Sequence, residues 1–250
     1  MNRGTAVAGG ALILALSCST VEAQQMTLTP QLGLASLQQP TLDPAFETRV
    51  HDQLQTFRKS SEGFTGEALL LRKDRGPHAS RYGVLVTAPS GSGRHLMGAA
   101  RMFAGLNHYQ LVGADRLGPL PTVDVLGVHY IKVRPERRDA FEKFAADTLN
   151  PAVGNLRPDL RFLYYKAVAG PQAGSYLTII AITKVSRDKY WPNGSDSDDL
   201  KAAFTPAVKA LATELQTYLV DGSFGTGMTA AVFESKEWAD WIVVPAPAVR

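Results

Sequence analysis

The chain has 250 residues, of which 45% are hydrophobic and 20% are charged, and its formal net charge at pH 7 is +3. This composition is typical of a globular protein with one large domain or two domains of about 100 residues. Basic and acidic residues are interspersed along the chain instead of gathered in one stripe, so the sequence does not predict nucleic-acid binding.

The first 23 residues have the pattern of a signal peptide. Arg3 supplies a positive start, residues 7–16 form an apolar run, and Val21-Glu22-Ala23 is a small-residue cleavage site. The apolar run is too short to span a bilayer and no later stretch approaches its length, so no transmembrane segment is expected. We therefore expect a bacterial protein that is periplasmic or secreted.

Cys18 is the only cysteine, and Ala15-Leu16-Ser17-Cys18 loosely resembles a bacterial lipoprotein cleavage box. Lipid anchoring through Cys18 is therefore an alternative to soluble export. After ordinary cleavage, the mature chain would contain no cysteine and could form neither a disulfide nor a thiolate ligand.

The hydrophobic pattern from residue 24 to 126 predicts four strands and two helices. Strands are expected at 32–37, 68–71 and 84–86, with helices at 45–57 and about 96–106, and a last strand near His108. GPHASRY, at residues 76–82, is expected to form a hairpin loop.

The same order recurs from residue 127 to 250. Strands are expected at 128–133, 161–168 and 175–182, with a helix over 136–149 that ends at Pro151. GPQAGSY, at residues 170–176, is the second hairpin loop. A second helix begins after an N-cap at Ser197 and is interrupted at Pro206, and strands follow at 229–233 and 238–244.

Shared residues indicate that the two halves are copies of one unit. The two heptads share Gly, Pro, Ala and Tyr at positions 94 residues apart, and Ala45-Phe46-Glu47 matches Ala140-Phe141-Glu142 at a separation of 95. A one-residue length change beside Lys73 and Lys166 would reconcile the two separations. Several matches in one order predict an internal repeat of about 95 residues.

Each copy has the order β-α-β-β-α-β, which is the ferredoxin-like arrangement. Two such units over residues 32–244 resemble a fused dimeric α/β barrel, the superfamily that includes antibiotic-biosynthesis-monooxygenase-like proteins. The resemblance rests on element order and length. It implies an α+β fold in which two sheets pack face to face in one chain, as a pseudo-dimeric barrel that can be monomeric. The superfamily also includes monooxygenases, isomerases and haem-using enzymes, so the resemblance indicates no single activity.

Six polar residues of the second copy are candidates for a ligand site. They alternate with Ile131, Val133, Leu177 and Ile179, and if those apolar residues face the helices, the six face the barrel interior. There their phenols and ammonium groups could orient a small apolar or anionic molecule. The alternative is that they satisfy one another in a mixed core. The six are Tyr130, Lys132, Tyr164, Lys166, Tyr176 and Thr178.

The histidines predict no metal site, because no two of the five have metal-ligand spacing. His129, on a central strand, and His108 are candidate haem ligands, with a core histidine as the alternative for His129. His78 lies in the first hairpin loop opposite Gln172 of the second, which argues against a ligand role shared by both loops.

No catalytic signature can be placed on the sequence. A Gly-x-Ser-x-Gly elbow is absent, and the glycine-rich segment at 90–94 lacks the Walker spacing. We therefore expect an exported small-molecule-binding protein. A monooxygenase-like or haem-using enzyme and an envelope protein-interaction module are the alternatives.

Overall fold

The computed structural model describes residues 24–88, 93–114, 120–153, 157, 159–220 and 238–247. The first repeat contains β2 (Gln31–Leu37), α1 (Pro44–Ser60), β3 (Ala68–Arg75), β4 (Tyr82–Ala88), α2 (Gly93–Met102) and β5 (Asn107–Leu111). The second contains β7 (Val125–Ile131), α3 (Arg138–Phe144), α4 (Asn150–Val153), β8 (Leu160–Ala169), β9 (Tyr176–Ile182), α5 (Lys184–Tyr190), α6 (Asp198–Ala203), α7 (Pro206–Tyr218) and β10 (Trp238–Val243). The predicted signal peptide and the predicted strand at 229–233 lie outside the described residues.

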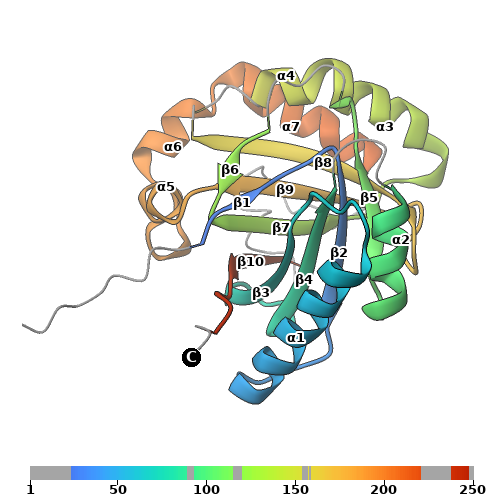
Figure 1. Cartoon of the computed structure of the whole chain (residues 1–250). Coiled ribbons are helices and arrows are strands. Elements are labelled where there is room, and N and C mark those ends of the chain that lie inside the picture. Colours follow the sequence, from blue (N-terminus) through green and yellow to red (C-terminus); the bar gives the residue numbers. More distant parts are fainter. Residues whose placement is uncertain are drawn as a thin grey trace, which may run out of the picture.

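Eight strands form one closed barrel in the order β10-β3-β4-β2-β5-β8-β9-β7 (Figure 1). Within each repeat, the first strand pairs with the third and the fourth, and the third pairs with the second. The fourth strand of each repeat then pairs with the second strand of the other, β5 with β8 and β10 with β3. The predicted pseudo-dimeric α/β barrel is therefore confirmed, and closure leaves neither sheet with an exposed edge.

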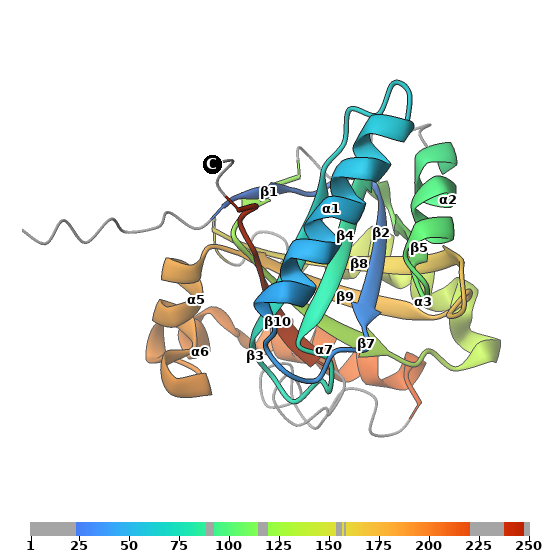
Figure 2. The same cartoon turned by 60° about the horizontal axis from the view of Figure 1, so that its bottom comes forward.

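The helices cover the two sheets from outside, as Figures 1 and 2 show. Helices α1 and α2 pack on the first sheet through Leu54, Phe57 and Leu96, while α3 and α7 pack on the second through Phe141 and Leu215. Leucines and aromatic rings from both sheets fill the barrel interior; they include Leu32, Leu71, Leu85, Leu163, Tyr165, Leu177 and Trp241. None of the helices in the described part combines the length and the hydropathy that crossing a bilayer requires.

The two ends of the barrel differ. A short ribbon, β1 (Met26–Thr27) paired with β6 (Thr122–Val123), precedes β2 and β7 and covers the end at which these strands begin. Met26 and Val123 of this ribbon pack into the interior core. The β3–β4 and β8–β9 hairpin loops lie at the opposite end, which we call the mouth.

The two junctions between the sheets match closely. Asp240 pairs with Arg75 and Trp241 with Lys73, and a register shift separates these two pairs. At the other junction His108 pairs with Ala169 and Tyr109 with Ala167, again with a register shift between them. Gly76 and Gly170 each follow the junction with φ of 104°. The two heptads therefore occupy equivalent corners, which supports the duplication.

The residues that the repeats share hold the first helix of each copy to its hairpin. The Tyr82 hydroxyl donates to Glu47 at 2.7 Å, and the Tyr176 hydroxyl donates to Glu142 at 2.5 Å. Beside each pair a phenylalanine contacts the tyrosine, with ring centroids 5.2 Å apart for Phe46–Tyr82 and 5.0 Å for Phe141–Tyr176. The tyrosine of each heptad and the Phe-Glu of each helix are thus one packing unit.

The predicted length change beside the lysines is wrong. Arg72 pairs with Tyr82 as Lys166 pairs with Tyr176, so Arg72 is the counterpart of Lys166 and the two hairpins have equal length. Both basic groups lie near the matching glutamate, Arg72 at 4.0 Å from Glu47 and Lys166 at 2.7 Å from Glu142. The separation between matching residues therefore changes from 95 to 94 in the loop between the first helix and the second strand of each repeat.

The second repeat departs from the prediction at several helix boundaries. Pro151 does not end the helix, because a π-helical turn at Ala145–Leu149 resets the backbone and Pro151 lies in the first turn of α4, where proline is tolerated.

β7 begins at Val125, before the predicted repeat boundary at 127. Helix α5 and the β1–β6 ribbon were not predicted. The N-cap at Ser197 and the break before Pro206 are confirmed.

Candidate functional site

The six predicted site residues do not share one face of the sheet. In the antiparallel register, Tyr130 lies opposite Leu177, whereas Ile131 lies opposite Tyr176. Cross-strand partners project to the same face, so Tyr130 and Leu177 point inward while Ile131 and Tyr176 point toward the helices. The expectation that Ile131 and Leu177 both face the helices is therefore wrong.

Tyr164, Lys166, Tyr176 and Thr178 are on the helix side of the second sheet. Phe141 of α3 packs edge-on against the rings of Tyr164 and Tyr176. Burial raises the pKa of both tyrosines well above the ordinary value, so they remain protonated. Lys166 is paired with Glu142, and Thr178 is buried opposite Tyr164. These four residues form a mixed core under α3, and Tyr176 also lines the cavity at the mouth.

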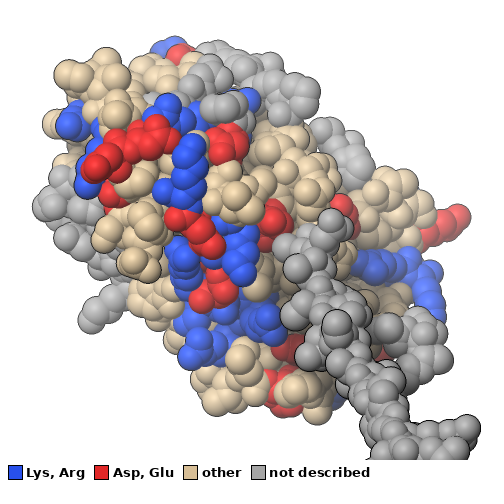
Figure 3. Space-filling view, turned by 90° about the vertical axis from the view of Figure 1, so that its left-hand side faces the viewer, with Lys and Arg blue, Asp and Glu red and all other residues tan. Residues whose placement is uncertain are grey.

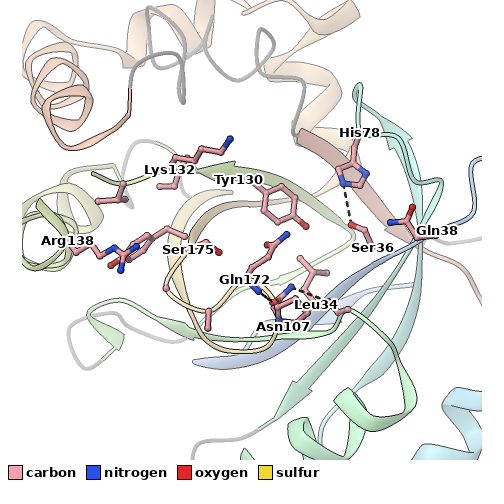
Figure 4. A pocket seen from close by; sticks show the side chains of 17 residues that line it. Leu34, Ser36, Gln38, His78, Asn107, Tyr130, Lys132, Arg138, Gln172 and Ser175 are labelled. Atoms are coloured by element: carbon pink, nitrogen blue, oxygen red, sulfur yellow. Dashed lines mark hydrogen bonds between the residues drawn. The ribbon is translucent and has the colours of Figure 1, made fainter. Parts of the chain in front are cut away.

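A cavity of about 760 Å³ opens at the mouth of the barrel, and it is the candidate functional site. It receives Tyr130 and Lys132 from the end of β7, Ser36 and Gln38 from the end of β2, and residues of both hairpin loops (Figure 4). Its volume lies within the range of small-molecule sites. Leu34, Ile131 and Val133 give it an apolar part.

The described lining of the mouth carries basic but no acidic side chains. Lys132 and Arg138 both line it, and Figure 4 places them on the side away from His78. A methyl group at Gly174 would lie 3.4 Å from Arg138 Nη1, so the glycine leaves room for the guanidinium. An anion that enters the mouth would therefore meet basic side chains in the described part of its lining.

His78 is a hydrogen-bond donor in the mouth. Its Nδ1 accepts the Ser80 backbone N–H at 3.2 Å, so the neutral ring carries its proton on Nε2. That nitrogen lies 3.4 Å from Ser36 Oγ. With its proton facing the hydroxyl, the imidazole cannot act as the base of a serine nucleophile.

Gln172, the counterpart of His78 in the other hairpin, is also oriented toward the mouth. Its backbone N–H donates to Asn107 Oδ1 at 2.7 Å, and its Oε1 accepts the Tyr109 hydroxyl at 3.2 Å. Figure 4 shows its side chain near Tyr130 in the middle of the opening. Together with Arg138, these two loop residues were missed from the sequence.

The two candidate haem ligands do not fit haem. His129 is buried beside a cavity of about 20 Å³, which is room for about one water, and its ring stacks on Trp238 with centroids 5.6 Å apart. Burial lowers the pKa of His129 to about 3, and its Nε2 has no hydrogen-bond partner within the described part of the chain. His108 is in β5, and its side chain lies near the start of α2, on the outer face of the barrel. Neither histidine lines the mouth.

Metal-binding side chains do not gather elsewhere in the part of the chain that the structure describes. No three His, Cys, Asp or Glu residues there form a group that could hold an ion.

A buried charge cluster joins the two repeats at the β3–β10 junction. Arg187 of α5 is 4% exposed and lies 2.6 Å from Asp74, 3.0 Å from Asp188 and 3.4 Å from Asp240. Burial raises the pKa of Asp240 to about 6, although Arg187 opposes this shift. On the face that carries α5 and α6, basic and acidic side chains alternate (Figure 3).

No protein-family model and no curated protein matches the sequence. Among solved structures, the chain is similar to an anthrone oxidase-like protein, with 13% identity, a TM-score of 0.47 and coverage of 90% of this chain and 93% of that one. It is also similar to a ferredoxin-fold protein related to antibiotic biosynthesis monooxygenases from Listeria monocytogenes, with 14% identity, a TM-score of 0.42 and coverage of 91% and 99%.

The fold assignment rests on the strand order of the chain itself and on its two matched junctions. The chain is a fused dimeric α/β barrel that is covered at one end and open at the other.

Proposed function

We propose that the protein binds a small, partly apolar anion in the barrel mouth. The observation that carries this proposal is the 760 Å³ cavity, whose described lining contains Lys132 and Arg138 and no acidic residue. The apolar side chains of Leu34, Ile131 and Val133 offer contact area for the rest of the ligand. An enzymatic function has no comparable support, because His78 is oriented as a donor and the two candidate haem ligands lie elsewhere.

We expect the negative charge of the ligand to determine its affinity for the protein. 4-Phenylbutanoate and its neutral amide have the same size and the same ring, so they form a matched pair of probes. We expect the carboxylate to bind about tenfold more tightly than the amide in isothermal titration calorimetry, since hydrogen bonds to charged groups are stronger than neutral ones.

Replacing Arg138 with glutamine should remove most of that preference. Arg138→Gln is expected to weaken 4-phenylbutanoate binding by about tenfold and leave the amide unchanged. Arg101→Gln, on the exposed end of α2, is the matched control and should have no effect. Equal affinities for the carboxylate and the amide in the unaltered protein would refute the proposed function.

We also propose that the protein acts outside the cytoplasm, on the strength of the signal-peptide pattern in residues 1–23. Expressed in a bacterial host and recovered from the periplasm, the protein should begin at Gln24 when its intact mass is measured. A mass that includes Met1 would contradict export by cleavage. A lipid-modified N-terminus at Cys18 would establish the alternative route.

A further inference from the structure

The amide of Gln172 is fixed in one orientation, and its fixed end is the acceptor. Its Oε1 accepts the Tyr109 hydroxyl at 3.2 Å, while the backbone N–H of the same residue is bound to Asn107 Oδ1 at 2.7 Å. The Asn107 amide is in turn oriented by donation from its Nδ2 to the Gly105 carbonyl at 3.1 Å. The side-chain NH₂ of Gln172 is thus the group left to face the mouth.

Tyr109 holds the Gln172 amide in this orientation. Its ring is buried in the barrel interior, and burial raises the pKa of its hydroxyl far above the ordinary value. The phenol therefore remains a donor at any physiological pH. In the structure this hydroxyl donates to Oε1 of Gln172, and the bond holds the amide with its NH₂ toward the mouth.

The pseudo-twofold relation places a second donor across the opening. His78 is the counterpart of Gln172 in the other hairpin loop, and both residues line the same cavity. The Ser80 backbone N–H occupies Nδ1 of His78, which leaves the proton on Nε2. The two equivalent loops thus both contribute to the mouth, His78 with its Nε2 proton toward Ser36 and Gln172 with its NH₂ toward the opening.

From this arrangement, which rests on the proposed function, we infer that the ligand carries a second feature besides its negative charge. The structure assigns to Gln172 the recognition of an uncharged oxygen acceptor, such as a ketone carbonyl, on the apolar part of an organic acid. Arg138 and Lys132 would meet the acid group, and Gln172 would select acids that contain the additional carbonyl. Gln172 is thus a specificity-determining residue.

A pair of acids that differ in a single carbonyl oxygen tests this inference. 4-Oxo-4-phenylbutanoate has the carboxylate and the ring of 4-phenylbutanoate together with one ketone. The purified protein is expected to bind the oxo acid about three- to tenfold more tightly in isothermal titration calorimetry, which is the range of one neutral hydrogen bond. In Gln172→Leu this ratio should fall to about one.

Two further variants separate recognition from folding. Tyr109→Phe leaves Gln172 in place but releases its amide, so the ratio is expected to fall part of the way. Gln53→Leu, on the exposed face of α1, should leave the ratio unchanged. A ratio near one in the unaltered protein, or a ratio that survives Gln172→Leu, would overturn this inference while anion binding stands. Failure to prefer 4-phenylbutanoate over its amide would instead overturn the proposed function.

Discussion

Replacing Arg187 with methionine is expected to destabilise the protein by about 3–5 kcal/mol at pH 7, the usual cost of removing one partner from a buried ion pair. The reason is that Asp74 and Asp240 would remain beside each other without their shared cation. Urea denaturation followed by circular dichroism measures the loss. Lys201→Met, at an exposed pair on α6, is the matched control and should produce no measurable change.

The loss should depend on pH in a defined direction. Burial raises the pKa of Asp240 to about 6, so the folded protein takes up a proton at higher pH than the unfolded chain, whose aspartates titrate near 3.9. Between about pH 4 and 6 the folded state therefore binds more protons, and the contribution of Asp240 to stability falls as pH rises. Without Arg187 this pKa rises further. The deficit of Arg187→Met should shrink toward pH 4, and a pH-independent deficit would show that lost packing is the cause.

Alanine at Gly170 is expected to cost about 2–5 kcal/mol. At φ of 104° a side chain is strained, and its Cβ would lie 2.8 Å from the Asn107 Cα. Gly76→Ala should cost a similar amount, because its Cβ would lie 2.6 Å from the Trp238 carbonyl oxygen at the equivalent corner. The same urea titration measures both variants.

Gly105 provides the control for the two corner glycines. It has φ of 81° with no atom within 4 Å of an added Cβ, so Gly105→Ala reports backbone strain alone and should cost about 1 kcal/mol. A harmless Gly76→Ala beside a severe Gly170→Ala would show that the two corners are not equivalent.

Much of the fold follows from patterns that short-range physics controls. The two heptads predicted the hairpins because the positive φ at Gly76 and Gly170 requires glycine. The heptads share a tyrosine because each tyrosine binds a glutamate of a helix. Helix caps such as Ser197 are equally local. Helix α5 was missed because it has only seven residues and owes its burial to the junction cluster around Arg187, which links segments far apart in the sequence.

The site could be predicted only in part, because the face that a strand residue occupies depends on register. Tyr130, Lys132 and Tyr176 line the cavity, whereas Tyr164 alternates in the same way but is packed under α3. The pairing of Tyr130 with Leu177 determines which face of the sheet each residue occupies. The sequence of a single strand does not reveal that pairing. The alignment of His78 with Gln172 was in the sequence, and it marked the mouth. In the sequence analysis it argues against a ligand role shared by the two loops, because the two side chains differ in chemistry.

The most direct test of the account is a chemical-shift titration of the ¹⁵N-labelled protein with 4-phenylbutanoate. We expect the shifted amides to cluster at the end of β2, at residues 130–138 and in the 170–175 loop, which together line the mouth. Shifts confined to the outer helices, or to the small cavity beside His51 and Leu54, would contradict a binding site inside the open end of the barrel.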